Sequence, residues 1–360
     1  MHTTRSVLNT ADRGVNMSNL AVKYRPKTFE DVSEQHLVVT MLKSLCESDH
    51  LDNRNFLLTG PAGTGKTTSA RIIANMLNRG KGDPIEIDAA SHNGVDSVRD
   101  IVQQARAYPV GCDYKVFIMD EVHSFSNPAW QVLLKTLEES PARSVFIMCT
   151  TNPEKIPATI LSRVQTFQLS KISLSGIQSR LKYVIEKENE EGRNITYDDT
   201  SLNFIAKLAN GGMRDALTLL DKALAYSKDI NSENLAQALN LPNYDSYFSL
   251  LNAYAKKDNM KIALIIHTVY NSGVNFVKWF EGFHSFVINV VKYIFLQDIE
   301  LTMIPSHYQD KISKYGVAHS VVCLKLAKKL LVLNQELKGT QYLQEVALTH
   351  LCSIPKKEEK

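Results

Sequence analysis

This sequence has no closely spaced cysteine pair, no long apolar stretch and little net charge. Its 5 cysteines among 360 residues are scattered and form no Cys-x-x-Cys pair, so neither a disulfide framework nor a structural zinc site is indicated. No apolar run reaches the roughly 18 residues that a transmembrane helix needs, and the N-terminus lacks the apolar segment of a signal peptide. These absences predict a reduced, cytoplasmic protein without a membrane partner.

The composition is that of ordinary globular domains. Hydrophobic residues make up 44% of the chain and charged residues 22%, which is typical of chains that bury a core. The length predicts two or three domains rather than one. A net charge of +3 neither requires nor excludes nucleic acid, because local clustering of charge decides such binding.

The most specific motif is GPAGTGKT at 60–67, which matches the phosphate-binding P-loop. The apolar run 55–59 before it suits a buried strand, and apolar residues at helical spacing follow it. Glycines let the loop point its N–H groups at phosphate, while Lys66 reaches the β- and γ-phosphates and the Thr67 hydroxyl binds Mg²⁺. We therefore expect ATP contacts from Gly60, Pro61, Ala62, Gly63, Thr64, Gly65, Lys66, Thr67 and Thr68.

A second apolar stretch, 114–121, reads as a buried strand that ends in two carboxylates. After a P-loop this pattern indicates that Asp120 holds Mg²⁺ through its hydration shell and that Glu121 polarises the attacking water. Strand-like stretches at 84–88 and 144–151 alternate with helical ones, which predicts a parallel α/β sheet. Ser91 or Asn93 is expected to cap the helix that follows the first of these strands.

The sequence changes to helical texture from residue 172 onward. Helices are expected at 179–189 and at 201–209. The stretch 210–216 is expected to open a third helix that runs to about 226, with Arg214 in its first turn. After 243 the predicted helices are 244–255, 259–271, 274–296, 317–337 and 341–351. This last region contains no glycine loop and no catalytic cluster.

Several motifs together resemble the gamma/tau family of bacterial DNA polymerase III, the AAA+ ATPases of the replicative clamp loader. The resemblance covers 20–225, and from 245 onward only length and helical texture match the family's collar. The motifs are YRP at 24–26, IEIDAAS at 85–91, NGVD at 93–96, IMDEVH at 118–123, LLKTLEE at 133–139, ILSR at 160–163 and RDA at 214–216.

The resemblance implies roles for residues outside the P-loop. Arg163 would reach into the ATP site of the neighbouring subunit, Arg214 would contact the γ-phosphate in its own subunit, and Thr150 would act as sensor 1. Val164 stands where the family carries a cysteine that takes no part in the chemistry. The segment packing against adenine would contribute Tyr24, Arg25, Pro26 and Val32, and DNA contacts would come from Ser91, Asn93, Arg99 and Arg106.

The resemblance also implies an organisation and a set of partners. We expect a disordered leader at 1–16, an AAA+ domain at 17–171, a helical lid at 172–241, a helical collar at 242–352 and a charged tail at 353–360. Subunits of this kind form a pentamer with copies of themselves or with other clamp-loader subunits. The assembly binds ATP and Mg²⁺, opens a sliding clamp and closes it around primer–template DNA, which triggers hydrolysis.

Two departures from the family set further expectations. Only Asn78–Gly82 fills the place where relatives carry a four-cysteine module, so we expect no zinc. The long tau extension is missing after the collar, which would suit a compact relative, including one encoded by a bacterial virus.

Two other functions remain open from the sequence. One is another AAA+ DNA-remodelling ATPase of the branch-migration type, against which the Leu161-Ser-Arg163 and IDAAS patterns argue. The other is a non-hydrolysing scaffold subunit of a clamp loader, resembling delta-prime. The intact set of Lys66, Thr67, Asp120 and Glu121 argues against a scaffold.

Overall fold

The computed structural model describes residues 19–48, 55–139, 141, 143–239, 241 and 244–352. They form two compact units, one from the described parts of Met1–Ile195 with Ala209–Ala225, the other from those of Thr196–Leu208 with Tyr226–Lys360. The predicted leader and charged tail lie outside the described residues. The division into AAA+ domain, lid and collar stays a prediction.

The first unit is built on a five-stranded sheet in which every pairing is parallel. The strand order is β2-β3-β4-β1-β5. The strands are β1 Asn55–Thr59, β2 Ile85–Asp88, β3 Lys115–Asp120, β4 Ser144–Thr150 and β5 Gln165–Gln168. The predicted parallel α/β sheet is confirmed. Strand β5 was not predicted, because only Phe167 of its four residues is buried and the stretch therefore shows no apolar pattern.

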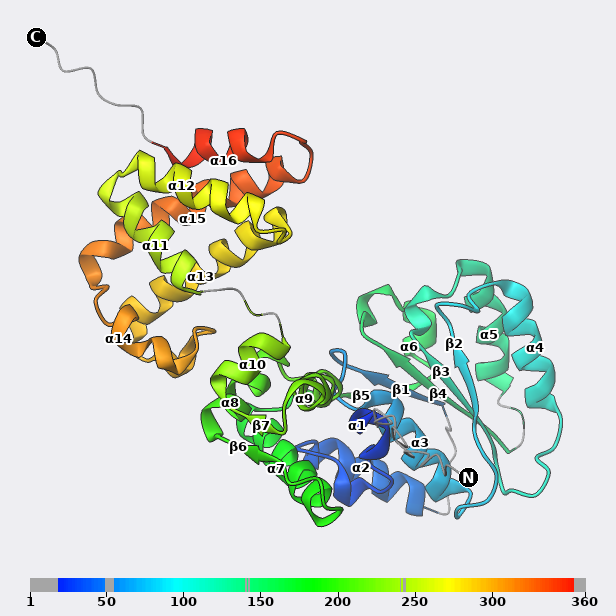
Figure 1. The fold of residues 1–360 in the computed structure, drawn as a ribbon. Helices are drawn as coiled ribbons and strands as arrows, with labels where there is room; N and C mark the ends of the chain where they lie inside the picture. The colour runs from blue at the N-terminus through cyan, green and yellow to red at the C-terminus, as the bar shows by residue number, and fades with distance from the viewer. Residues whose placement is uncertain are drawn as a thin grey trace, which may run out of the picture. The chain divides into compact units, whose positions relative to one another are not determined.

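Helices cover both faces of this sheet (Figure 1). Successive strand residues face opposite sides, so Phe56 and Leu58 join one apolar cluster while Leu57 joins the other. The first cluster contains residues of α2 (His36–Glu47) and α3 (Lys66–Leu77), and the second contains residues of α4 (Val95–Arg106) and α5 (Asn127–Glu139). The short helix α6 (Ala158–Leu161) follows β4.

One cap prediction was wrong, and one strand that was predicted correctly ends earlier than expected. Helix α4 has Gly94 at its N-cap and no side-chain capping bond, because the Ser91 hydroxyl bonds Asp88 instead, at 3.0 Å. The predicted strand 114–121 stops at Asp120, because Glu121 turns into the left-handed region with φ 50° and ψ 41°. This turn sets the direction of the Glu121 side chain.

An N-terminal segment and two helices of the predicted lid complete the first unit. The segment contains α1 (Leu20–Lys23) and the 3-10 turn η1 (Phe29–Asp31). The helices are α7 (Leu174–Glu190) and α9 (Met213–Tyr226). Both helices were expected, but α7 begins five residues before its predicted start at 179. Ser173 caps this earlier start by accepting a hydrogen bond from the Gly176 N–H.

The second unit is helical apart from the short strands β6 (Thr196–Tyr197) and β7 (Asp229–Ile230). Its core is rich in aromatic side chains, including the buried Tyr247, Phe280, Phe283 and Phe286. No helix among the described residues is long and apolar enough to cross a membrane. The helices are α8 Asp199–Leu208, α10 Ser232–Ala238, α11 Tyr244–Lys256, α12 Asn259–Asn271, α13 Phe276–Leu296, α14 Gln309–Ile312, α15 Val317–Leu337 and α16 Leu343–Leu351.

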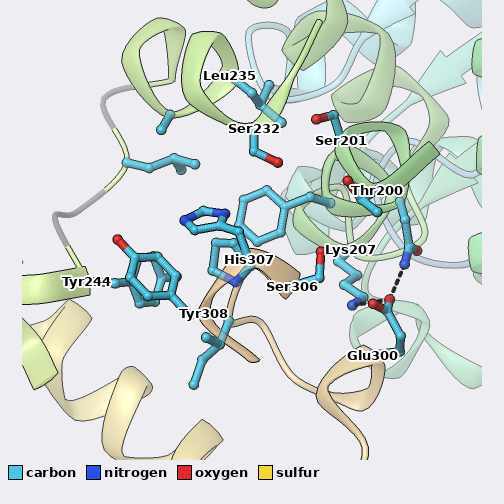
Figure 2. Close-up of a pocket in the computed structure, with 16 residues that line it drawn as sticks. Thr200, Ser201, Lys207, Ser232, Leu235, Tyr244, Glu300, Ser306, His307 and Tyr308 are labelled. Atoms are coloured by element: carbon cyan, nitrogen blue, oxygen red, sulfur yellow. Dashed lines mark hydrogen bonds and ion pairs between the residues drawn. The ribbon is translucent and has the colours of Figure 1, made fainter. Parts of the chain in front are cut away.

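A small cavity of this unit lies between α8, α10 and the segment 300–308 (Figure 2). At its edge the Lys207 ammonium lies 2.9 Å from Glu300, which also accepts a hydrogen bond from Asn203. The cavity measures about 60 Å³, well below the roughly 300 Å³ at which ligand pockets begin. We therefore attribute it to packing between these elements rather than to a ligand site.

Candidate functional site

The largest group of predicted site residues surrounds a cavity of about 460 Å³ in the first unit, within the usual size range of ligand pockets. It lies at the carboxyl ends of β1 and β3, as expected for an open parallel sheet. Three stretches far apart in sequence line it, drawn from 19–33, 62–68 and 213–218, together with Asp120, Glu121, Ile172 and Arg180.

The P-loop backbone requires glycine at two positions. Gly60 has φ 139°, and a Cβ there would lie 2.3 Å from the Leu169 carbonyl oxygen. Gly63 has φ 72°, and its Cβ would lie 3.0 Å from Gly212 Cα, just before α9. Both positions combine a backbone conformation unfavourable to other residues with close backbone neighbours. The loop thus keeps its shape only with these glycines.

Lys66, the charged residue of the loop, is buried, with 6% of its surface exposed. Its ammonium donates hydrogen bonds to the carbonyls of Gly60 at 2.9 Å and Pro61 at 2.8 Å. Burial lowers the pKa of Lys66, and the negative charges of Glu121 and Asp120 oppose this effect. The loop carbonyls therefore hold the Lys66 ammonium in place beside the cavity.

Thr67 and Asp120 bring two hard oxygen donors together. The Thr67 hydroxyl donates to Asp120 Oδ2 at 2.6 Å, and the Glu121 N–H donates to Asp120 Oδ1 at 3.0 Å. Hydroxyl and carboxylate oxygens suit Mg²⁺, which keeps several water ligands and takes others from phosphate. The described residues contain no group of three or more His, Cys, Asp and Glu side chains that could hold a metal by themselves. The expected absence of zinc stays a prediction.

Glu121 belongs to a polar network at the end of β4. Its Oε2 accepts from the Thr151 hydroxyl at 3.1 Å and lies 3.2 Å from His123 Nδ1. The same His123 nitrogen lies 3.1 Å from the Thr150 hydroxyl, which also accepts from the Asn152 N–H at 3.0 Å. Thr150 is buried and does not line the cavity, and His123 links its hydroxyl to Glu121.

Helix α9 begins directly on the P-loop. The Met213 N–H donates to the Gly63 carbonyl at 2.9 Å, and Arg214 lines the cavity. The predicted base-side residues Tyr24, Arg25, Pro26 and Val32 line the same cavity.

Arg163 is not among the residues that line this cavity. It follows α6, where its guanidinium donates to the Thr159 carbonyl at 2.7 Å and to the Ser162 hydroxyl at 2.9 Å. The guanidinium also lies 2.5 Å from Glu138 at the end of α5. The predicted arginine finger therefore has partners within its own chain and does not line the cavity of that chain.

The sequence of this chain matches known protein families. Residues 83–173 match the family described as DNA polymerase III, delta subunit, and residues 176–229 match DNA polymerase III clamp loader subunit, ATPase lid domain. DNA polymerase III subunit gamma of Buchnera aphidicola subsp. Schizaphis graminum is 32% identical over 343 residues, 88% of this chain and 92% of that protein. The chain belongs to the DNA polymerase III gamma/tau family.

Longer gamma/tau proteins match over a smaller share of their length. DNA polymerase III subunit tau of Bacillus subtilis is 41% identical over 229 residues, which are 58% of this chain but 39% of that protein. Among solved structures, a variant of Thermotoga maritima RuvB is similar, with a TM-score of 0.50 and 19% identity over 64% of this chain and 78% of that one. At that identity the likeness shows the fold alone, and it agrees with the predicted P-loop α/β class.

The predicted DNA contacts of this gamma/tau chain lie outside the cavity. Ser91 and Asn93 are exposed in the loop before α4. On α4 itself, Arg99 is exposed and pairs with Asp96 at 2.9 Å, and Arg106 is the exposed last residue of the helix. The four residues thus follow one loop and one helix, and their role in binding DNA stays a prediction.

Several residues that line or support the cavity were not predicted from the sequence. Arg180 lines the cavity from α7, and Val22 and Leu217 contribute apolar surface to it. None of these stands in a recognisable motif, because each reaches the cavity only through the packing of distant segments. For His123 and Thr151 the sequence did contain a signal, because both closely follow the strands that carry the predicted residues Asp120 and Thr150.

Proposed function

We propose that this chain is an ATP-hydrolysing motor subunit of a sliding-clamp loader. Membership of the gamma/tau family supports the clamp-loader role. The observation that carries the ATPase activity is the 2.6 Å contact between Thr67 Oγ1 and Asp120 Oδ2, in the same cavity as Lys66 and Glu121. A phosphate-binding lysine, two Mg²⁺-compatible oxygens and a carboxylate that can act on water are the parts that phosphoryl transfer needs.

Each of these groups has a task in the proposed reaction. Lys66 and the loop N–H groups would bind the β- and γ-phosphates, and Thr67 and Asp120 would hold Mg²⁺. Bound there, Mg²⁺ would neutralise charge on the transferring phosphoryl group. Glu121 orients the attacking water and accepts its proton. Because Thr151 and His123 hold its carboxylate, those two side chains set where the Glu121 oxygens point.

Two arginines complete the proposed mechanism from different chains. Arg214 lines the cavity of its own subunit and would contact the γ-phosphate there. Arg163 would leave Glu138 and enter the site of a neighbouring subunit, where a guanidinium stabilises charge on the transferring group. Assembly with copies of this chain or with other subunits would therefore be a condition for fast hydrolysis.

In the proposed cycle the ATP-bound assembly opens the clamp, and primer–template DNA triggers hydrolysis and clamp release. DNA would be held by phosphate contacts, so its binding should weaken steeply with salt and ignore sequence. Ser91, Asn93, Arg99 and Arg106 are the proposed contact residues. We favour this cycle over branch migration, because the likeness to RuvB concerns the fold only.

The test of the ATPase proposal is Glu121→Gln, with Glu233→Gln of α10 as a matched control because Glu233 is exposed in the second unit. The amide keeps the shape of the side chain but accepts no proton. We expect unchanged ATP affinity and hydrolysis slowed by about 10²-fold or more, the usual contribution of a general base. Normal turnover in Glu121→Gln would show that another group activates the water.

A further inference from the structure

Glu188, near the end of α7, is a carboxylate with 0% of its surface exposed. Its Oε1 accepts hydrogen bonds from the Lys23 ammonium at 2.6 Å and the Tyr24 hydroxyl at 2.7 Å. On its other side, Arg193 Nε lies 2.9 Å from Oε2. A buried charge needs such partners, because an isolated one would be very costly. Two of the three partners belong to the N-terminal segment, more than 160 residues away in sequence.

The electrostatics of this cluster keep Glu188 charged. Burial by itself would raise the pKa of Glu188, but the hydrogen bonds from Lys23 and Tyr24 and the charge of Arg193 outweigh it, so the pKa is lowered. Burial, followed by the bond to Glu188, raises the pKa of Tyr24 to about 12. The tyrosine therefore remains a protonated donor, and the contact is a charge-assisted hydrogen bond, the stronger kind.

The N-terminal segment has further bonds to the same two helices. The Leu20 N–H donates to Asp221 Oδ2 of α9 at 2.8 Å, and the Arg180 guanidinium of α7 donates to the Tyr24 carbonyl at 2.9 Å. At the start of α7, Glu34 accepts from the Ser173 N–H at 2.7 Å. The segment is thus attached along the length of α7 and to α9.

The same segment also lines the nucleotide cavity. Val22, Tyr24, Arg25 and Pro26 contribute to its wall, whereas Glu188 does not. The P-loop supplies the phosphate-binding groups, so the apolar and aromatic surface of this wall is left for the nucleoside. Glu188 therefore contacts two consecutive residues of the segment, Lys23 and Tyr24, without being able to touch a nucleotide itself.

We propose that Glu188 is a positioning residue that sets the nucleoside-binding wall of the cavity. By holding Lys23 and Tyr24 it fixes that wall to α7, which also contributes Arg180 to the cavity. The nucleoside wall and the arginines of α7 and α9 then keep one arrangement relative to each other. This inference rests on the proposed binding of ATP, and it assigns the nucleoside part of that affinity to a residue outside the cavity.

The test separates the nucleoside from the phosphates. The full chain is titrated with ATP and, separately, with inorganic tripolyphosphate, each with Mg²⁺, in the wild type, Glu188→Gln and Glu190→Gln. The control Glu190 is an exposed residue of α7 that pairs with Lys187. In Glu188→Gln we expect ATP to bind about tenfold more weakly, the scale of one hydrogen bond to a charged group, with tripolyphosphate affinity unchanged.

Other outcomes overturn the proposal. If Glu188→Gln weakens ATP and tripolyphosphate equally, the residue supports the fold in general, and if it changes neither, Glu188 does not position the wall. A wild type and a Glu190→Gln control that both fail to bind ATP would instead refute the proposed function. If Glu188→Gln does not fold, Tyr24→Phe removes one hydroxyl and keeps the charges, and unchanged ATP affinity in that variant would also contradict the proposal.

Discussion

The cavity around Lys66 and the surface around Arg163 carry charges assigned to the same reaction but are built differently. Lys66 is buried, and two loop carbonyls hold its ammonium. The Arg163 side chain is 34% exposed and is paired with Glu138, whose side chain is 44% exposed. A partly exposed ion pair contributes little to stability, so the loss of Glu138 as a partner would cost Arg163 little. In our proposal the two groups act differently: Lys66 acts within its own chain, whereas Arg163, nearer the surface, acts on a second chain.

At Arg163 we expect a loss of rate without a loss of binding. In Arg163→Ala, ATP binding by the chain itself should stay intact, while the kcat of the assembly falls by about 10³-fold or more, the contribution of an arginine finger. Arg79→Ala is the control, since Arg79 is an exposed arginine after the end of α3. Nucleotide titration and steady-state turnover on the same samples measure both quantities. A loss of affinity matching the loss of rate would place Arg163 in its own chain's site.

Lys66→Ala tests the other side of the comparison. Removing a buried, hydrogen-bonded cation from a phosphate site should weaken ATP binding by about 10²-fold, and hydrolysis should vanish with it. Lys155→Ala, at an exposed lysine after β4, should change neither. Calorimetric titration with ATP and Mg²⁺ measures the affinities. Unchanged affinity in Lys66→Ala would remove the phosphate-binding role of the loop.

Arg214→Ala gives the smallest of these effects. Because Arg214 lines the cavity from α9, its loss should weaken ATP by about tenfold, as expected for one charge-assisted contact at the edge of a site. Affinity for ADP should fall less, since ADP lacks the γ-phosphate. Titrations with the two nucleotides measure the ratio. An equal loss for both would move the Arg214 contact away from the γ-phosphate.

Much of the fold could be predicted from the sequence, because local patterns determine it. The apolar strands β1 and β4, the glycines of the P-loop and helices such as α12 and α15 lie where periodicity and motifs indicated. The same patterns indicated Lys66, Thr67 and Asp120 as neighbours, since strand ends in a parallel sheet meet at one edge.

The remaining features depend on contacts that no local pattern contains. The left-handed turn at Glu121 and its bond to Thr151 arise where β3 and β4 end side by side. Glu188 reads as an ordinary helix-surface residue, yet it is buried because the N-terminal segment covers it. Ser91 does not cap α4, because its hydroxyl donates a hydrogen bond to Asp88 instead. Such outcomes follow from tertiary packing, which a single sequence does not show.

Mixing two inactive-site variants tests whether a second chain completes the ATP site. Arg163→Ala and Lys66→Ala should each hydrolyse ATP very slowly or not at all alone, but together they would form sites with Lys66 from one chain and Arg163 from the other. We predict that turnover with primer–template DNA returns on mixing and rises with protein concentration, whereas Arg214→Ala mixed with Lys66→Ala gains nothing over Arg214→Ala alone. If the first mixture stays inactive while the wild-type chain is active and self-assembles, Arg163 does not act between chains.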